Sequence, residues 1–428
     1  MSDEREMIVV VRDAGVGWVE ALTRGVRADD CAVGLVTGPL TGAEEAALRP
    51  LVTELMVVDD PTDPHQVVTA ASALCRGRRA SAVLSASDGA VVAAARAGEF
   101  LGIGRTSAES LARTRDKYAA RTVLRDAGLP VPPYALLSAA GDAEKVAAEV
   151  GLPAVLKPVN GGAGHLVLPV RTVDELADAY DRAERTLLRS PFLRHLYTST
   201  VHDIDPRRTF LVEGMLTGRE YSVDVVIRDG EIECLPLLDK FLLDERYFEL
   251  GFVSPPIDLS HERETALLCA AEQAIVAHGL DNTVAHVELI DDARLGPTIV
   301  EVNAGRPGGL PVCTLVQWMT GVDTFAEQVS AARGVPSPRT TPRLPIPLGG
   351  FLLFPEQSGT LRAVHGLEEV REHGDVVEAF STVRPGDELS VDHEIPAIVV
   401  VVAGFADEDD LAETYGEIRD LVEFEMES

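Results

Sequence analysis

Short apolar runs alternate with helical patterns over the N-terminal part of the chain. The runs that predict strands lie at residues 7–11, 32–36, 55–58 and 82–84. Helical patterns lie between them, for example at residues 65–77 and 89–101. Strands that alternate with helices are typical of parallel sheets, because two parallel strands need a crossover connection. We therefore predict a small parallel α/β domain over residues 1–105.

A different pattern begins near Thr106. Residues 107–127 predict two helices, and the prolines of LPVPPY at 129–134 start an extended stretch. Further predicted helices lie at 142–150, 173–189 and 262–278. Predicted strands lie at 150–159, 167–170, 209–213, 220–228, 232–238, 284–290 and 298–302. Short turns join several of these strands, which predicts an α+β domain with mainly antiparallel strands over residues 106–335.

A segment rich in proline and polar residues follows. It reads GVPSPRTTPRLPIP at residues 334–347, and we place a linker at 336–348. Residues 349–428 then predict a small β-rich domain. Its predicted strands lie near 349–354, 375–381 and 396–402, before a helix at 407–422. The length of 428 residues agrees with two or three domains.

The formal net charge of −31 narrows the range of partners. An acidic surface repels nucleic acids and anionic membranes, so we expect neither as a partner. It repels ATP as well, so a nucleotide site in this chain must gather its own cations. Individual lysines and arginines are therefore informative. The charge by itself is typical of a soluble or salt-adapted surface.

The cysteines and the N-terminus favour a cytoplasmic protein. Five scattered cysteines form no C-x-x-C pair, which is typical of a reducing compartment and argues against a cysteine-based zinc site. The acidic start, MSDEREMIVVVRD, lacks the features of a signal peptide. No apolar stretch approaches the ~20 residues that cross a bilayer.

Two glycines follow the first predicted strand. Gly15 and Gly17 resemble the start of G-x-G-x-x-G, but Glu20 occupies the third glycine position, where close helix packing needs glycine. A tight turn is the simpler interpretation, and we expect no dinucleotide site here.

Two apolar strands carry charged residues inside them. Glu288 lies within AHVELI, Glu301 lies within TIVEVN, and a turn at 291–297 joins the two strands. In a hairpin both carboxylates reach one face, and Asn303 points to the same face because it is two residues beyond Glu301. Two carboxylates and an amide oxygen are hard ligands that suit Mg²⁺. The alternative, a set of exposed polar residues on a half-buried hairpin, is weakened by the apolar neighbours.

His286 lies on the face of Glu288. The two residues form an H-x-E motif like that of zinc deaminases, but no P-C-x-x-C follows it. We therefore expect His286 to support the metal ligands or to face a substrate.

A lysine and a glycine-rich loop form a second candidate site. Lys157 ends an apolar strand, and NGGAGHL at 160–166 follows it. The lysine can place a charge on phosphate oxygens, and a mobile loop with Gly161, Gly162 and Gly164 can close its backbone N–H groups over terminal phosphates. The loop is not a Walker P-loop, because no Gly-Lys-Ser/Thr ends it.

A third candidate lies in FLVEGMLTGREYSVD at 210–224. Extended backbone at 213–216 could hydrogen-bond adenine, and Glu220 could accept from ribose hydroxyls. By itself this segment leaves its function open.

Together, these segments resemble the ATP-grasp superfamily in order and spacing, from about residue 80 to the C-terminus. The resemblance implies an N-terminal Rossmann-like domain, central ATP-grasp subdomains with a mobile lid at about 125–210, and a small β-rich C-terminal domain. It also implies that the chain binds ATP with Mg²⁺, for which Mn²⁺ is the alternative ion.

The resemblance implies a role for each candidate residue. Lys117, in the helical stretch at 116–132, matches a phosphate contact, and Lys157 matches the lysine that reaches the α- and β-phosphates. The implied metal ligands are Glu288, Glu301 and Asn303, with the family's separations of 13 and 2 residues. The other implied nucleotide contacts are Gly161, Gly162, Gly164, His165, Glu213, Met215, Leu216 and Glu220.

Three segments look like carboxylate–amine ligases of the L-amino-acid ligase type. They are P-G-G after Asn303, the strand A-H-V-E-L, and YFELGFVSPP at 247–256. Two positions depart from the pattern. Many relatives carry arginine four residues after the second metal glutamate, where this chain has Gly305, and Arg306 follows one residue later. The lid loop carries His165 where serine or glycine is common.

This type of ligase implies amide or peptide bond formation through an acyl-phosphate, with release of ADP and phosphate. The implied partners are a small-molecule carboxylate, such as an amino acid, and an amine. Lys157 and Arg306 are the implied catalytic residues. The implied substrate contacts are Glu249, His286, Arg306, Gly308 and Gly309.

Two alternatives stay open from the sequence. One is an ATP-dependent carboxylase of the biotin or purine-pathway type, which uses bicarbonate. The other is an ATP-binding regulatory protein without catalysis. The oligomeric state is also open, although relatives are often homodimers.

Overall fold

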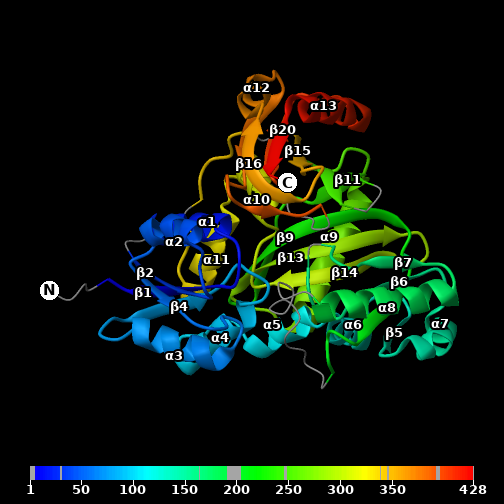
Figure 1. Ribbon diagram of the computed structural model, residues 1–428, viewed down its shortest axis with the longest axis horizontal. Coiled ribbons are helices and arrows are strands. Elements are labelled where there is room, and N and C mark those ends of the chain that lie inside the picture. The colour runs from blue at the N-terminus through cyan, green and yellow to red at the C-terminus, as the bar shows by residue number, and fades with distance from the viewer. Residues whose placement is uncertain are drawn as a thin grey trace.

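The computed structural model describes residues 5–28, 31–162, 164–189, 204–244, 248–337, 339–344, 347–391 and 396–427. An α/β unit at the N-terminus, antiparallel sheets in the middle and a smaller C-terminal unit follow one another along the chain (Figure 1). This arrangement confirms the predicted combination of α/β and α+β parts.

The N-terminal sheet is parallel and has the strand order β3-β2-β1-β4. Its strands are β1 (Met7–Arg12), β2 (Ala32–Thr37), β3 (Glu54–Val57) and β4 (Ala80–Leu84). The helices around it are α1 (Gly17–Ala28), α2 (Gly42–Leu48), α3 (Pro64–Leu74), α4 (Val91–Phe100) and α11 (Thr324–Arg333). Apolar residues of α3 and α4 cover one face of the sheet, and those of α1 and α11 cover the other. Helix α11 therefore returns from far along the chain to complete this unit (Figure 1).

A small antiparallel sheet with the order β5-β8-β6-β7 lies in the predicted lid region. Its strands are β5 (Tyr134–Leu137), β6 (Ala154–Pro158), β7 (Leu168–Val170) and β8 (Phe210–Gly214). Helices α7 (Ala143–Val150) and α8 (Val173–Arg189) bury their apolar faces against it. Residues 163 and 190–203 of the predicted lid lie outside the described residues, and the mobility of the lid stays a prediction.

The largest sheet has nine strands in the order β14-β13-β9-β11-β12-β15-β19-β17, with β10 beside β9. The strands are β9 (Gly218–Arg228), β10 (Glu231–Cys234), β11 (Leu238–Leu243), β12 (Glu249–Ser254), β13 (Thr283–Asp292), β14 (Gly296–Ala304), β15 (Leu348–Leu353), β17 (Val376–Ser381) and β19 (Ile398–Val402). Helices α5 (Ala108–Arg115), α6 (Lys117–Asp126) and α9 (His261–His278) pack on one face, and α10 (Leu310–Thr320) packs on the other.

The C-terminal strands continue the central sheet. Strand β15 pairs with β12, so the predicted boundary at residue 349 does not separate two sheets. The remaining elements are β16 (Gly359–His365), β18 (Glu388–Leu389) and β20 (Glu423–Glu427), which form a three-stranded sheet, and helices α12 (Leu367–Glu372) and α13 (Glu408–Leu421).

The structure differs from the predicted elements in one strand and in several elements that were missed. The single strand predicted at 232–238 is wrong, because β10 ends at Cys234 and β11 begins at Leu238. Pro236 lies between them and has no N–H for a strand ladder. The elements that were not predicted are α10, α11, α12, β11, β12, β16, β18 and β20.

The proline-rich segment connects α11 to β15, and residues 338, 345 and 346 of it lie outside the described residues. Arg339 anchors the segment, because its guanidinium lies 2.7 Å from Glu233 and 3.1 Å from Glu327. Across the described ranges of the chain, we find no helix with both the length and the apolar character for crossing a membrane.

Candidate active site

The predicted metal ligands lie on one face of the hairpin formed by β13 and β14. Glu288 pairs directly with Glu301, and His286 pairs with Asn303 two residues further along. Paired residues and residues two apart point to one face of a sheet, so these four side chains share a face. Asn303 is buried, whereas the Glu288 and Glu301 side chains are 23% and 15% exposed. Two partly open carboxylates beside an amide are a donor set that fits a hard cation.

No other metal site competes with this trio in the described part of the chain. Among the residues that the structure describes, there is no cluster of three or more His, Cys, Asp or Glu side chains that could hold a metal ion. The predicted trio differs from such a cluster because its third ligand is an amide.

A lysine that the sequence analysis missed lies among these carboxylates. The Nζ of Lys240, on β11, lies 2.7 Å from Glu220 and 3.9 Å from both Glu249 and Glu288. Burial disfavours the charged amine, but the three carboxylates outweigh burial and hold the pKa of Lys240 well above its ordinary value. A lysine inside the apolar run LDKFLL was the signal in the sequence.

Two of the three carboxylates near Lys240, Glu288 and Glu249, have opposite pKa shifts. Burial alone would raise the pKa of Glu288, but Lys240, His286 and other nearby cations outweigh burial and lower it. Burial also raises the pKa of Glu249, and there the charges of neighbouring carboxylates add to burial. Glu288 is therefore ready to act as an anionic ligand near neutral pH.

Lys117 reaches the same face from the start of α6. Its Nζ lies 2.7 Å from Glu301 Oε1 and 3.2 Å from the carbonyl oxygen of Gly161. Asp116 caps the helix by accepting from the N–H of Ala119, which holds Lys117 at the first helical position. The lysine therefore connects a predicted metal ligand to the predicted phosphate loop.

Lys157 lies at the end of β6, just before Pro158, and its ammonium group forms an ion pair with Glu213 of the neighbouring strand β8. Arg121 of α6 pairs with the same carboxylate and donates to the carbonyl of Val300 at 2.8 Å. Burial opposes the charge of Glu213, but Arg121 and Lys157 outweigh it and lower the pKa of Glu213 to about 2. The side chain of Glu213 thus holds two cations, whereas the sequence predicted only a backbone contact to adenine.

The residues predicted to contact adenine and ribose come shortly after Glu213 in the chain. The N–H of Met215 donates to the carbonyl of Pro153 at 3.1 Å, and Met215 and Leu216 are half-buried. Glu220 lies on β9 and faces Lys240, so its carboxylate lies beside the metal candidates. The nucleotide contacts themselves stay predictions.

Arg306 comes one residue later than in many relatives, and its guanidinium pairs with Asp88 in the loop before α4. Burial disfavours its charge, but Asp88 outweighs burial, and with Glu301 and Glu288 it raises the pKa of Arg306. Gly305 has a φ of +87°, in the left-handed region, and this turn brings Arg306 toward the N-terminal unit.

His286 belongs to a buried pair that involves a second missed residue. Its Nδ1 lies 2.8 Å from Oδ1 of Asp224, which is 1% exposed and lies on β9. The N–H of Gly308 donates to the same oxygen at 3.0 Å, and a Cβ added to Gly308 would lie 2.4 Å from the imidazole Nδ1. The loop after the metal ligands is therefore packed directly on His286. Gly309 follows it and precedes the first residue of α10.

The glycine-rich loop lies against the N-terminal unit. A Cβ added to Gly162 would lie 3.0 Å from Oδ2 of Asp88. Further along, the N–H of His165 donates to the carbonyl of Gly162 at 3.3 Å, while Gly164 is exposed. Residue 163 of this loop lies outside the described residues.

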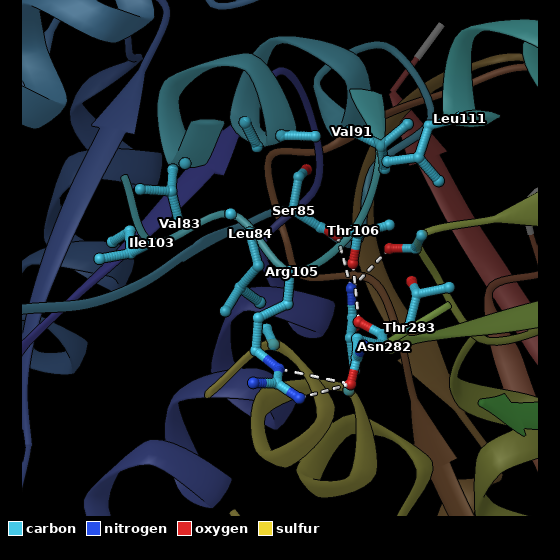
Figure 2. A pocket seen from close by; sticks show the side chains of 17 residues that line it. Val83, Leu84, Ser85, Val91, Ile103, Arg105, Thr106, Leu111, Asn282 and Thr283 are labelled. Carbon is cyan, nitrogen blue, oxygen red and sulfur yellow. Dashed lines mark hydrogen bonds between the residues drawn. The ribbon is translucent and has the colours of Figure 1, made fainter. Parts of the chain in front are cut away.

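A cavity of about 40 Å³ lies where the N-terminal unit meets the central sheet (Figure 2). Val91 and Leu111 line it, and Arg105 and Thr106 hydrogen-bond to Asn282 at its edge. Among the described residues that line it, none is a predicted site residue. The cavity therefore lies at the junction of the two units, beside Gly305 and the turn that carries Arg306.

The four lysines of the chain are distributed unevenly. They are Lys117, Lys145, Lys157 and Lys240, in a chain with 38 lysines and arginines. Lys145 is exposed on α7, whereas the other three have side chains that are 9–12% exposed and lie at the candidate site. Two of these compact ammonium charges, those of Lys117 and Lys240, lie beside the face that carries Glu288 and Glu301.

Comparison with known proteins agrees with this geometry. Residues 150–314 match the ATP-grasp domain family, and residues 351–427 match the L-amino acid ligase C-terminal domain 2 family. The crystal structure of an L-amino acid ligase from Bacillus licheniformis has the same fold, with a TM-score of 0.81 and 20% identity over 100% of both chains.

Curated relatives match over shorter regions. A D-alanine–D-alanine ligase of Laribacter hongkongensis is 29% identical over 198 residues, which cover 45% of this chain and 56% of the relative. An uncharacterized protein of Sinorhizobium fredii is 30% identical over 282 residues, 65% of this chain and 54% of that protein. The chain thus spans about half the length of these curated relatives. The chain therefore contains an ATP-grasp domain at residues 150–314 and a C-terminal domain of the L-amino acid ligase type at residues 351–427.

Proposed function

We propose that this protein is an ATP-dependent carboxylate–amine ligase that acts on an amino acid or another small carboxylic acid. One observation carries the proposal: Lys117 lies 2.7 Å from Glu301 and Lys240 lies 3.9 Å from Glu288, so two of the four lysines contact the predicted metal ligands. In a chain with a net charge of −31, lysines that these carboxylates hold in place would supply the positive charge that a polyanion such as ATP needs.

Glu288, Glu301 and Asn303 would hold Mg²⁺, with Mn²⁺ as the alternative. The trio fits the ion, because all three donors are hard oxygens and the lowered pKa of Glu288 keeps that carboxylate charged at neutral pH. Bound there, the ion would offset negative charge on the phosphoryl group during transfer.

The proposed reaction has two steps. A substrate carboxylate oxygen attacks the γ-phosphorus of ATP, and the new O–P bond replaces the bond to ADP, which leaves. The amine nitrogen then attacks the acyl carbon, the C–O bond to phosphate breaks, and the nitrogen loses a proton. Both steps move negative charge between oxygen atoms, so fixed cations around them lower the barrier.

We assign a separate role in this reaction to each candidate residue. Lys117 and Lys157 would contact the phosphates, and Arg306 would stabilise the acyl-phosphate. Closure of the loop at 160–166 would exclude the water that hydrolyses such an intermediate. The candidates for substrate contacts are Glu249, His286, Gly308 and Gly309.

The C-terminal domain favours the ligase over the two alternatives. Residues 351–427 match a domain family of L-amino acid ligases, which supports an amino acid substrate over the bicarbonate of a carboxylase. The complete set of predicted metal ligands and lysines argues against an ATP-binding protein without catalysis.

A screen of ADP release over pairs of carboxylates and amines, with mass detection of products, tests the proposal. We expect ADP release that requires both substrates, and Glu301→Ala should reduce it by roughly a hundredfold or more, because it removes a metal ligand and the partner of Lys117. Glu231→Ala, at an exposed glutamate of β10, is the matched control and should leave activity unchanged. Unchanged ADP release in Glu301→Ala would end the metal assignment, and release with bicarbonate alone would favour a carboxylase.

A further inference from the structure

A carboxylate of the N-terminal unit holds Arg306. Asp88 lies in the loop between β4 and α4, and its two oxygens accept from Arg306 Nε at 2.5 Å and Nη2 at 3.2 Å. The side chains of both residues are 19% exposed. A two-point contact with a planar guanidinium fixes its direction and its rotation, which a single hydrogen bond does not.

The same carboxylate holds a second arginine. Arg115 Nη1, at the end of α5, lies 3.0 Å from Asp88 Oδ1. Burial opposes the charge of Asp88, but the two arginines outweigh burial and hold its pKa well below the ordinary value. The two arginines therefore favour the charged form of Asp88, which is the form that pairs with Arg306.

The backbone before Arg306 is also anchored to the N-terminal unit. A Cβ added to Gly305 would lie 3.2–3.3 Å from Val91 and Leu111, which face each other in Figure 2. The Nε2 of Gln328 donates to the carbonyls of Gly305 at 2.5 Å and Ser85 at 2.7 Å. Residues near β4 and α4 therefore place both the backbone before Arg306 and its guanidinium group.

Asp88 lies where three predicted ATP-binding segments meet. Arg115 precedes Lys117 by two residues, so the contact ties Asp88 to the start of α6. Gly162 of the glycine-rich loop packs on its other oxygen. Asp88 thus joins the loop, the helix of Lys117 and the turn that carries Arg306.

From this geometry we propose that Asp88 is a positioning residue, which holds Arg306 in the orientation that stabilises the acyl-phosphate. The inference rests on the proposed ligase function. It explains how Arg306 can act although it lies one residue later than in many relatives, because the N-terminal unit supplies the carboxylate that redirects it. A contact that only joined the two units would stabilise the fold without affecting the rate of acyl transfer.

Steady-state kinetics of Asp88→Asn test the proposal. We expect kcat for amide formation to fall by about tenfold to a hundredfold, as for other supporting hydrogen bonds at reaction centres, while the KM for ATP changes less than about twofold. The ratio of amide to ADP should fall as well, because a misplaced Arg306 leaves more acyl-phosphate to water. Asp88→Glu keeps the charge but moves it by one methylene, so it should recover stability and only part of kcat.

Glu44→Gln is the matched control. Glu44 lies on α2 of the same N-terminal unit, and its carboxylate pairs with another arginine, Arg12. Thermal unfolding of each variant shows whether the fold is retained. Equal kinetics for Asp88→Asn and Glu44→Gln, or a rise in the KM for ATP that matches the fall in kcat, would refute the positioning role while the ligase function stands. Absence of ADP release by the wild-type protein with every substrate pair would instead refute the proposed function.

Discussion

Each lysine at the candidate site has a carboxylate partner. Lys117 pairs with Glu301, Lys157 with Glu213, and Lys240 most closely with Glu220. Such pairing offsets the cost of keeping charges away from water, which would otherwise neutralise a buried lysine. These carboxylates hold the lysines in place before the nucleotide binds. A bound triphosphate would then compete with the carboxylates for the same ammonium groups.

Lys240→Met tests the role of the missed lysine. We expect the free energy of unfolding to fall by about 2–3 kcal/mol, because three carboxylates lose the cation that they share. The cost is limited because water still reaches part of each carboxylate. ADP release should fall by roughly a hundredfold because Glu288 also loses its nearest lysine. Urea unfolding and ADP assays measure both effects. Lys145→Met, at the exposed fourth lysine, is the control, and equal effects of the two substitutions would contradict the assignment.

At the scale of elements, the register of the β13–β14 hairpin aligns Glu288 with Glu301, and the loop after β14 closes over the same face. Gly308 in this loop approaches His286 so closely that a side chain has no room. The loop, the hairpin and β9 therefore form one packed unit around the buried Asp224.

Gly308→Ala should break this unit locally. The added methyl would lie 2.4 Å from the imidazole, so either His286 leaves Asp224 or the loop moves away from the metal face. We expect ADP release to fall by about tenfold or more with little change in secondary structure. Gly141→Ala is the control, because a Cβ there meets no atom within 4 Å. Full activity of Gly308→Ala, measured beside this control, would show that the loop tolerates displacement.

At the scale of the whole molecule, the parts of the chain are not independent units. The central sheet continues from the ATP-grasp domain into the C-terminal strands, and α11 completes the N-terminal unit.

Helix α9 packs on the central sheet and ends at His278, which is 0% exposed. Neither ring nitrogen of His278 has a hydrogen-bond partner within the ranges that the structure describes.

His278 should make the stability of the protein depend on pH. Burial lowers its pKa to about 4, against 6.5 for the exposed ring, and nearby arginines add to the shift. Above pH 6.5 the ring is neutral in both states, whereas between pH 6.5 and 4 only the unfolded chain takes up the proton, so stability falls. We expect a loss of about 2 kcal/mol from this residue between pH 7 and pH 5.

Urea unfolding at the two pH values measures this loss. In His278→Leu the decrease in the free energy of unfolding between pH 7 and pH 5 should be smaller by that amount. His261→Leu changes an exposed histidine at the start of α9 and should leave the decrease as in the wild type. An identical pH dependence in His278→Leu and the wild type would exclude His278 as a source.

The elements predicted correctly are those with a strong local pattern. β1 and α8 were predicted to within one residue, and β13 and β14 to within two residues at each end, because apolar runs and helical spacing are properties of neighbouring residues. β11 and α10 were missed. A lysine interrupts the first, and the second is apolar enough that spacing does not mark one face as exposed.

The sequence by itself determined the candidate metal trio, because Glu288, Glu301 and Asn303 lie in one hairpin whose geometry follows from local pairing. Only the tertiary structure decided which groups surround that trio. Asp88 and Arg306 are 218 residues apart, and Arg121 and Glu213 are 92 apart. Such contacts arise from the order of strands in a sheet and from the packing of one unit on another. No periodicity in the chain encodes them.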